Sequence, residues 1–178
     1  MNELETKIID ISVDDIKDKL ANINATLVKK ENQINYIFDF EDRRLLAKKG
    51  YARVRVVEDL LHNKSVTYMT TKRLISEEVY KLMEENETII DDSEAGIKIF
   101  KSLGLLICEE VKKYRESYSY KNTLVEIDIN DKSFCPFPYL EIESESEDEV
   151  AEIVNLLGYT MADTNPKSIY EIMNDKGL

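Results

Sequence analysis

The chain has 178 residues, a formal net charge of -12 at pH 7, and 43% hydrophobic and 34% charged residues. This length fits a single domain, residues 1–178, built around one core. The acidic excess excludes nucleic-acid binding through a broad basic surface, because phosphate neutralisation needs clustered lysine and arginine. No apolar run approaches the roughly 18 residues of a membrane span, and acidic residues begin almost at once where a signal segment would stand. We therefore expect a cytoplasmic protein that does not bind a membrane.

The few cysteine and histidine residues also limit the chemistry. Cys108 and Cys135 have neither the spacing of metal ligands nor a disulfide framework, so both are expected to be reduced thiols. The single histidine, His62, lies in a polar segment that is typical of a hairpin turn. Catalysis by histidine is therefore not expected.

The first half of the chain predicts mostly extended structure. Ser12 is a typical N-cap residue, and apolar residues follow it at helical spacing as far as Ile23, which predicts a helix. Residues 41–49 are expected to form one or two helical turns that end at Gly50. The remaining segments predict strands at 3–7, 25–30, 34–40, 51–58, 65–72 and 78–90.

In the second half, capping residues and glycines delimit three further helices. Residues 91–93 cap a helix that Gly104 ends. Ser146 and Glu149 form a capping-box sequence before another helix, and residues 165–166 begin a last one. Strands are predicted at 106–118, 122–130 and 139–145. The predicted fold class is α+β, with most strands in one antiparallel sheet that invites closure into a barrel.

Charged side chains at every second position form rows along several predicted strands. The basic rows are Arg53 with Arg55 and Lys113 with Arg115, and the acidic rows are Glu3 with Glu5, Glu126 with Asp128, and Glu141 with Glu143 and Glu145. Any one row is also typical of a solvated sheet face in a purely structural protein. The rows are segregated by sign, however, acidic in the first and last strands and basic in the middle, whereas random solvated faces would mix signs.

Enclosed rows of opposite charge need a ligand that is itself rich in charge. If the sheet closes with these faces inward, the buried charges are costly unless such a ligand completes the site. Cations in this number suit a polyphosphate, and the carboxylates beside them suit a hard divalent metal that bridges phosphate oxygens. The sequence therefore predicts a local, enclosed anion site that contains metal.

The same residues form a series of short motifs. They are Glu3-x-Glu5-x-Lys7, Arg53-x-Arg55, Thr70-Thr71-Lys72, Lys113-Tyr114-Arg115, Asp128 and Glu141-Ile142-Glu143. In this order and spacing, over nearly the whole chain, they resemble the CYTH superfamily of triphosphate tunnel metalloenzymes, which includes class IV adenylyl cyclases, thiamine triphosphatases and inorganic triphosphatases.

The chain also departs from the family pattern. Glu85 and Glu87 match an acidic pair, but Met83 stands where an arginine is expected, and Lys81 is a candidate substitute. The Gly-rich turn of many cyclase-like members is replaced by residues 135–138, Cys-Pro-Phe-Pro. Lys167 resembles a lysine that reaches the phosphate in some members, and it is equally typical of a surface lysine at a helix N-terminus.

The resemblance implies an eight-stranded antiparallel β-barrel, a triphosphate tunnel, with helices packed outside. It implies a small-molecule triphosphate substrate and Mg²⁺ or Mn²⁺ as cofactor. The implied phosphate-binding residues are Lys7, Arg53, Arg55, Lys72, Lys113, Arg115 and Lys167. The implied metal ligands are Glu3, Glu5, Glu141 and Glu143, with Glu85, Glu87 and Asp128 as further ligands or their partners. The implied catalytic residues are Glu3, Glu5, Lys7 and Arg55.

The sequence leaves several functions open. The first expectation is hydrolysis of inorganic tripolyphosphate or an organic triphosphate, because the replaced Gly-rich turn disfavours the cyclase branch. The alternatives are a class IV adenylyl cyclase that makes cyclic AMP and pyrophosphate, and a non-catalytic polyphosphate- or nucleotide-binding module. The physiological substrate, the preferred metal and the oligomeric state, including a homodimer, stay open.

Overall fold

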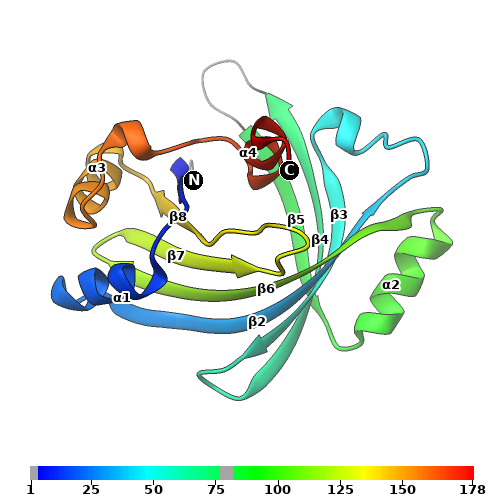
Figure 1. The fold of residues 1–178 in the computed structure, drawn as a ribbon. Coiled ribbons are helices and arrows are strands. Elements are labelled where there is room, and N and C mark those ends of the chain that lie inside the picture. Colours follow the sequence, from blue (N-terminus) through cyan, green and yellow to red (C-terminus); the bar gives the residue numbers. More distant parts are fainter. Residues whose placement is uncertain (1–3, 77–81) are drawn as a thin grey trace. The chain divides into compact units, whose positions relative to one another are not determined.

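The computed structural model describes residues 4–76 and 82–178 of the chain (Figure 1). The contacts between residues divide the protein into two compact units. Unit 1 is residues 1–30 and 114–178, and unit 2 is residues 31–113. The single domain expected from the chain length stays a prediction. None of the helices in the described ranges is long and apolar enough to cross a membrane.

The described residues form eight strands and four α-helices (Figure 1). In order they are β1 (Leu4–Ile9), α1 (Val13–Asn22), β2 (Thr26–Asp39), β3 (Tyr51–Asp59), β4 (Lys64–Ser76), β5 (Leu82–Ile90), α2 (Ser93–Ser102), β6 (Leu106–Tyr120), β7 (Thr123–Asn130), β8 (Tyr139–Ser144), α3 (Glu147–Leu156) and α4 (Ile169–Lys176). Two short 3₁₀ turns, η1 (Leu46–Lys48) and η2 (Met161–Asp163), lie between them.

The strands form one sheet in the order β1-β8-β7-β6-β2-β3-β4-β5. The neighbouring strands whose registers are known are antiparallel. The predicted α+β fold with an eight-stranded antiparallel sheet and helices is therefore confirmed. In the part of the chain that the structure describes, no ladder of hydrogen bonds joins the two end strands, β1 and β5.

Strand β2 differs from the prediction, which divided it into two strands. It runs unbroken for 14 residues, because the polar stretch at its centre stays in register with β3. Glu31 pairs with Asp59, and Asn32 donates a hydrogen bond to its partner Glu58, with 2.9 Å between Nδ2 and Oε2. Hydrogen bonding across the ladder thus replaces the alternation that the sequence lacks there.

The turns at both ends of β3 are set by aspartate side chains. The Asp39 carboxylate accepts hydrogen bonds from the backbone of Leu45 (3.0 Å) and Leu46 (2.9 Å), which limits the predicted helical turns of residues 41–49 to η1. Asp59 accepts from the backbone of Leu61 (2.9 Å) and His62 (3.2 Å) and so closes the predicted hairpin turn.

The predicted start of α3 at Ser146 is confirmed but its capping box does not form, and the predicted start of α4 is wrong. Ser146 makes no side-chain cap on α3, because Glu149 accepts instead from Ser144 Oγ at 2.7 Å and Asn122 Nδ2 at 2.8 Å. Helix α4 begins at Ile169 and not at residues 165–166. Its N-cap is Ser168, which exchanges backbone and side-chain hydrogen bonds with Glu171 in a capping box.

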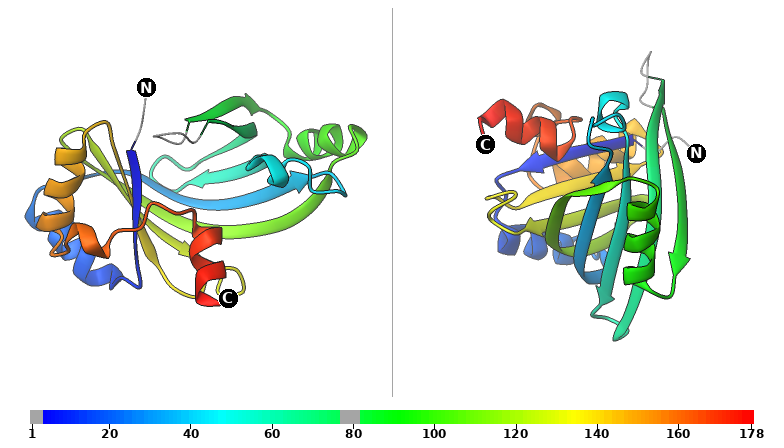
Figure 2. Two further views of the ribbon diagram at one scale, coloured as in Figure 1. Left: turned by 90° about the horizontal axis from the view of Figure 1, so that it is seen from above. Right: turned by 90° about the vertical axis from the view of Figure 1, so that its right-hand side faces the viewer.

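In unit 1, helices α1 and α3 cover one face of strands β1, β8 and β7 (Figure 2). The alternating residues Ile8, Val125, Ile127, Leu140 and Ile142 pack there against apolar residues of both helices. A smaller cluster of Cys135, Tyr139, Ile169 and Met173 holds α4 in place. Period-two alternation therefore leaves Glu5, Lys7, Glu126, Asp128, Glu141 and Glu143 on the opposite face, which we call the polar face of unit 1.

In unit 2, helix α2 covers one face of the sheet in the same way (Figure 2). Phe38, Ala52 and Val54 are almost fully buried there and pack with Phe100 of α2. Residues at the intervening positions, including Asn35, Arg53 and Arg55, share the other face, which we call the polar face of unit 2.

Candidate functional site

Three carboxylates converge on the polar face of unit 1. Glu5 of β1 lies directly opposite Glu143 of β8, and Glu141 lies two residues from Glu143 on the same face. One carboxylate oxygen of each residue lies within 4.8 Å of those of the other two. We call Glu5, Glu141 and Glu143 the acidic centre.

The cations near the acidic centre do not fully compensate the charges of its carboxylates. Burial raises the pKa of Glu141 to about 8, and the charge of Glu5 adds to the rise, although Lys7 and Arg115 oppose it. A carboxyl group that resists ionisation beside other carboxylates is stabilised by a cation. Three carboxylate oxygens suit hard cations such as Mg²⁺ or Mn²⁺, which bind oxygen ligands and keep several waters. The residues of the acidic centre therefore fit a divalent metal.

Lys7 is the cation of strand β1. Its side chain is 5% exposed, and its ammonium forms an ion pair with Glu5. Its backbone is fixed from the other side by Asn165, through two hydrogen bonds of 2.9 and 2.8 Å between N and O atoms. The ladder with β8 and the bridge to Asn165 thus hold Lys7 beside the acidic centre.

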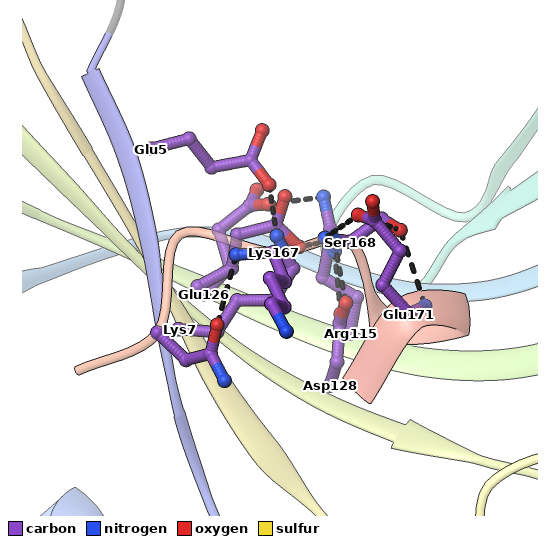
Figure 3. Close-up of polar contacts among 10 residues, drawn as sticks. Glu5, Lys7, Arg115, Glu126, Asp128, Lys167, Ser168 and Glu171 are labelled. Atoms are coloured by element: carbon purple, nitrogen blue, oxygen red, sulfur yellow. Dashed lines mark hydrogen bonds and ion pairs between the residues drawn. The ribbon is translucent and has the colours of Figure 1, made fainter. Parts of the chain in front are cut away.

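Arg115 of β6 lies beside the acidic centre and binds three carboxylates (Figure 3). It forms a bidentate pair with Asp128, with 2.6 Å for both Nε to Oδ1 and Nη2 to Oδ2. Its Nη2 lies 3.3 Å from Glu141 Oε2, and its Nη1 pairs with Glu126. Burial lowers the pKa of Arg115, but the hydrogen bonds of Asp128 and the charges of Asp128, Glu126 and Glu141 together raise it more, so the guanidinium stays charged.

Glu126 also belongs to this group, although the family resemblance did not assign it to the site. It lies opposite Glu141 across β7 and β8, is 1% exposed, and accepts a 2.8 Å hydrogen bond from Ser117 Oγ. The signal for it was its position two residues before Asp128 on one strand face.

The polar face of unit 2 carries the predicted basic cluster, Arg53, Arg55 and Lys72. Glu87 lies 3.5 Å from Arg53 and 3.4 Å from Arg55, measured from carboxylate oxygen to guanidinium nitrogen. Glu85 lies 3.2 Å from Lys72 Nζ. The two arginine side chains are only 14% and 21% exposed, so this row is not a solvated sheet face. Thr70 is a further member of the cluster that the sequence did not indicate. Its Oγ1 donates a hydrogen bond of 2.7 Å to Glu87 Oε2.

Two further predicted site residues, Lys167 and Lys113, lie in the described part of the chain. Lys167, which precedes helix α4, is about half exposed and pairs with Asp175 of that helix at 2.6 Å, next to the Asn165 bridge (Figure 3). Lys113 is half-buried on β6, two residues before Arg115. Glu3 and Lys81 lie outside the described residues, as does the side chain of Met83.

The fold and the two charged groups define a class of protein with a basic cluster and an acidic centre that fits a metal, on one antiparallel sheet. Residues 1–169 match the CYTH domain. The chain therefore belongs to the CYTH family. A comparison with curated proteins found no match.

Solved structures share this fold. The PH1012 protein of Pyrococcus horikoshii OT3 is 25% identical, with a TM-score of 0.75 over 95% of this chain and 98% of that one. A candidate adenylate cyclase of Vibrio parahaemolyticus is 14% identical, with a TM-score of 0.76 over 98% of both chains. A candidate adenylyl cyclase of Hippeastrum with a dominant triphosphatase activity is 17% identical, with a TM-score of 0.71 over 100% of this chain and 97% of that one.

Proposed function

We propose that this protein is a divalent-metal-dependent hydrolase of a triphosphate, with a small-molecule triphosphate as its substrate. The observation that carries the proposal is the acidic centre, in which three carboxylates lie within 4.8 Å of one another and burial keeps the pKa of Glu141 high. A site that only bound an anion would not need this group, because carboxylates repel phosphate. The CYTH assignment and the triphosphatase activity of the Hippeastrum protein support the same conclusion.

Each group has a distinct role in the proposed reaction. Glu5, Glu141 and Glu143 would hold Mg²⁺ or Mn²⁺, which would neutralise charge on the phosphoryl oxygens when bound. Arg53 and Arg55 bind phosphate oxygens as fixed cations, and Glu85 and Glu87 keep the basic cluster oriented before substrate arrives. Arg115 is oriented by Asp128 and Glu126, and Lys7 by Glu5. Water attacks the terminal phosphorus, and the bond from this phosphorus to the bridging oxygen breaks. The diphosphate part of the substrate is the leaving group, and the attacked phosphorus is released as orthophosphate.

The test is a panel of metals and substrates. Purified protein is stripped of metal and assayed with Mg²⁺ or Mn²⁺ against tripolyphosphate, thiamine triphosphate and ATP, and all products are identified. We expect orthophosphate release that EDTA abolishes. Arg55→Ala and Glu143→Gln should lower kcat/KM by at least about a hundredfold, a loss typical of a group that stabilises the transition state. Unchanged turnover in both variants would contradict the proposal.

Two control variants separate the site from general surface charge. Arg73 and Glu84 form an ion pair in unit 2, and Arg73 is 70% exposed on the face opposite the basic cluster. Glu152 pairs with Lys121 on the surface of unit 1. Arg73→Ala and Glu152→Gln should retain full activity.

The same panel distinguishes the two other functions. A class IV adenylyl cyclase would convert ATP to cyclic AMP and pyrophosphate, because the substrate's own 3′-hydroxyl attacks the α-phosphorus. A binding module would bind a triphosphate tightly in the presence of metal without any product. Either result would replace the hydrolase proposal.

A further inference from the structure

The polar face of unit 2 changes in chemical character along its strands. Cross-strand register arranges its side chains in transverse rows, each with one residue from each strand. One row contains Ile37, Arg53, Thr70 and Glu87, and the next contains Tyr51, Lys72 and Glu85. These rows combine cations with carboxylates, and they suit a phosphate chain.

The row on the other side of Arg53 has a different composition. It runs across four neighbouring strands, and each residue pairs with the next one: Asn35 of β2, Arg55 of β3, Tyr68 of β4 and Ile89 of β5. This row holds one cation, one amide, one aromatic ring and one aliphatic side chain. The Arg55 guanidinium lies 5.1 Å from the centre of the Tyr68 ring, so the ring and the cation are in contact. We call Tyr68 and Ile89 the apolar shelf.

Ile89 is not needed for the core of unit 2. It is 62% exposed, whereas the next residue, Ile90, points to the opposite face, where its Cδ1 lies close to Gly96 of α2. An isolated exposed isoleucine needs no explanation. This one continues a line of apolar residues from Tyr68, directly beside the basic cluster.

Buried amides lie beside the shelf on β2. Asn35 is 7% exposed and Gln33 is 3% exposed, and both are on the face of Arg55. Gln33 Nε2 donates to Glu31 at 2.7 Å, but its Oε1 has no hydrogen-bond partner in the described part of the chain. Buried acceptors are normally paired, so this oxygen is available to a donor such as water or a ligand group. The amides add hydrogen bonding next to an apolar surface, which is the composition of small-molecule binding sites.

We propose that the apolar shelf and Asn35 bind the organic group of the substrate, so that the substrate is an organic triphosphate with a planar ring. The inference rests on the proposed function, because the basic cluster must hold the phosphates. A bare phosphate chain would occupy only the charged rows. A ring attached to it extends over Arg55 onto Tyr68 and Ile89, where it stacks and buries apolar surface.

The test compares organic and inorganic substrates in variants of the shelf. Ile89→Asn and Tyr68→Leu are assayed with ATP, thiamine triphosphate and tripolyphosphate, in the presence of Mg²⁺ or Mn²⁺. The matched control is Leu103→Asn, because Leu103 is 65% exposed on unit 2 outside its polar face. We expect the wild type to prefer one organic triphosphate. Each shelf variant should lower kcat/KM for that substrate about tenfold, the loss of one stacking contact. Turnover of tripolyphosphate should not change in Ile89→Asn, and Leu103→Asn should behave as the wild type with every substrate.

The outcomes separate the two proposals. A preference of the wild type for tripolyphosphate, or equal losses for organic and inorganic substrates, would overturn the shelf while the hydrolase proposal stands. If no triphosphate is hydrolysed, the hydrolase proposal fails, and calorimetric Kd values for the same ligands decide. Tighter binding of an organic triphosphate that weakens in Ile89→Asn would support the shelf, and equal Kd values in all variants would refute it.

Discussion

Arg115 and Asp128 form a bidentate ion pair, 2.6 Å at both contacts, between neighbouring strands β6 and β7. The Asp128 side chain is fully buried, and that of Arg115 is 13% exposed. The pair therefore fixes the plane of the guanidinium and directs its third contact to Glu141 of the acidic centre. Asp128, expected as a further metal ligand or as a partner of the ligands, contacts Arg115, which in turn contacts Glu141.

Asp128→Asn should destabilise the protein strongly. Removal of one partner from a buried ion pair costs about 3–5 kcal/mol, and we expect the lower end because Glu126 and Glu141 still contact Arg115. Urea denaturation measures the free energy of unfolding. The control is Asp175→Asn, which breaks the half-exposed pair with Lys167 and should cost no more than about 1 kcal/mol. Equal losses in the two variants would show that burial of Asp128 does not decide its contribution.

Glu116 should make the protein sensitive to acid. It lies under α1, where it accepts hydrogen bonds from Tyr114, Tyr118 (2.8 Å) and Lys17 (3.0 Å). Burial raises the pKa of Glu116, but these three donors lower it more, so the folded pKa lies below the unfolded one. The stability it contributes is complete above the unfolded pKa and is lost as the pH falls through the folded pKa. The loss should begin as the pH falls below the pKa of glutamate in the unfolded chain, about 4.3. Denaturation measured between pH 3 and 7 should show it.

The Glu116→Gln variant isolates this contribution. It should be less stable than the wild type at pH 7 and should lose less stability on acidification. Glu110→Gln is the control, because Glu110 is on the same strand in a more exposed pair with Lys112. If the stability of Glu116→Gln falls on acidification as much as that of the wild type, the effect belongs to other carboxylates.

Much of the fold followed from the sequence, because the period of two and the turn residues are local signals. Seven of the predicted strands correspond to strands of the structure, and the two segments 25–30 and 34–40 are one strand, β2. Their polar junction is held by pairing with β3, which depends on residues more than 20 positions away. Ser146 and Glu149 show the same limit, since Ser144 and Asn122 compete for the Glu149 carboxylate only after the strands have assembled.

The charged rows were also predictable, but the partners within them were not. Alternation placed Arg115 and Asp128 on strand faces, yet their contact depends on the register between β6, β7 and β8. The turns and the segment 131–138 set this register. The pattern alone likewise could not reveal that Arg115 contacts three carboxylates, or that Asn35, Tyr68 and Ile89 align with Arg55.

Glu143→Gln should stabilise the metal-free protein and abolish its response to metal. The substitution replaces one of the mutually repelling carboxylates of the acidic centre with a neutral amide. It therefore also removes a negatively charged ligand for a cation. Thermal unfolding is measured with EDTA and with Mn²⁺. We expect a higher Tm than the wild type in EDTA, and no increase with Mn²⁺, whereas a metal that binds the native wild type raises its Tm. A Mn²⁺-induced increase equal to that of the wild type would exclude Glu143 as a ligand.

Metal affinity should rise with pH through the pKa of Glu141. Burial and the charge of Glu5 raise that pKa to about 8, so in the metal-free protein the carboxyl group is mostly protonated at pH 6–7. Metal binding must displace this proton. The apparent affinity for Mn²⁺ should therefore increase about tenfold for each pH unit below 8 and level off above it, as expected for one coupled proton.

The same shift should act on the stability of the metal-free protein, with the opposite sign to that of Glu116. The folded pKa of Glu141 lies above the unfolded value, so its contribution is complete below the unfolded pKa and is lost as the pH rises through about 8. Calorimetry at pH 6.5 in two buffers of different ionisation enthalpy measures the released proton, and denaturation in EDTA measures the stability. Glu141→Gln should bind metal weakly and show neither dependence. Proton release that persists in Glu141→Gln would place the titrating group elsewhere, because glutamine has no proton to lose in this range.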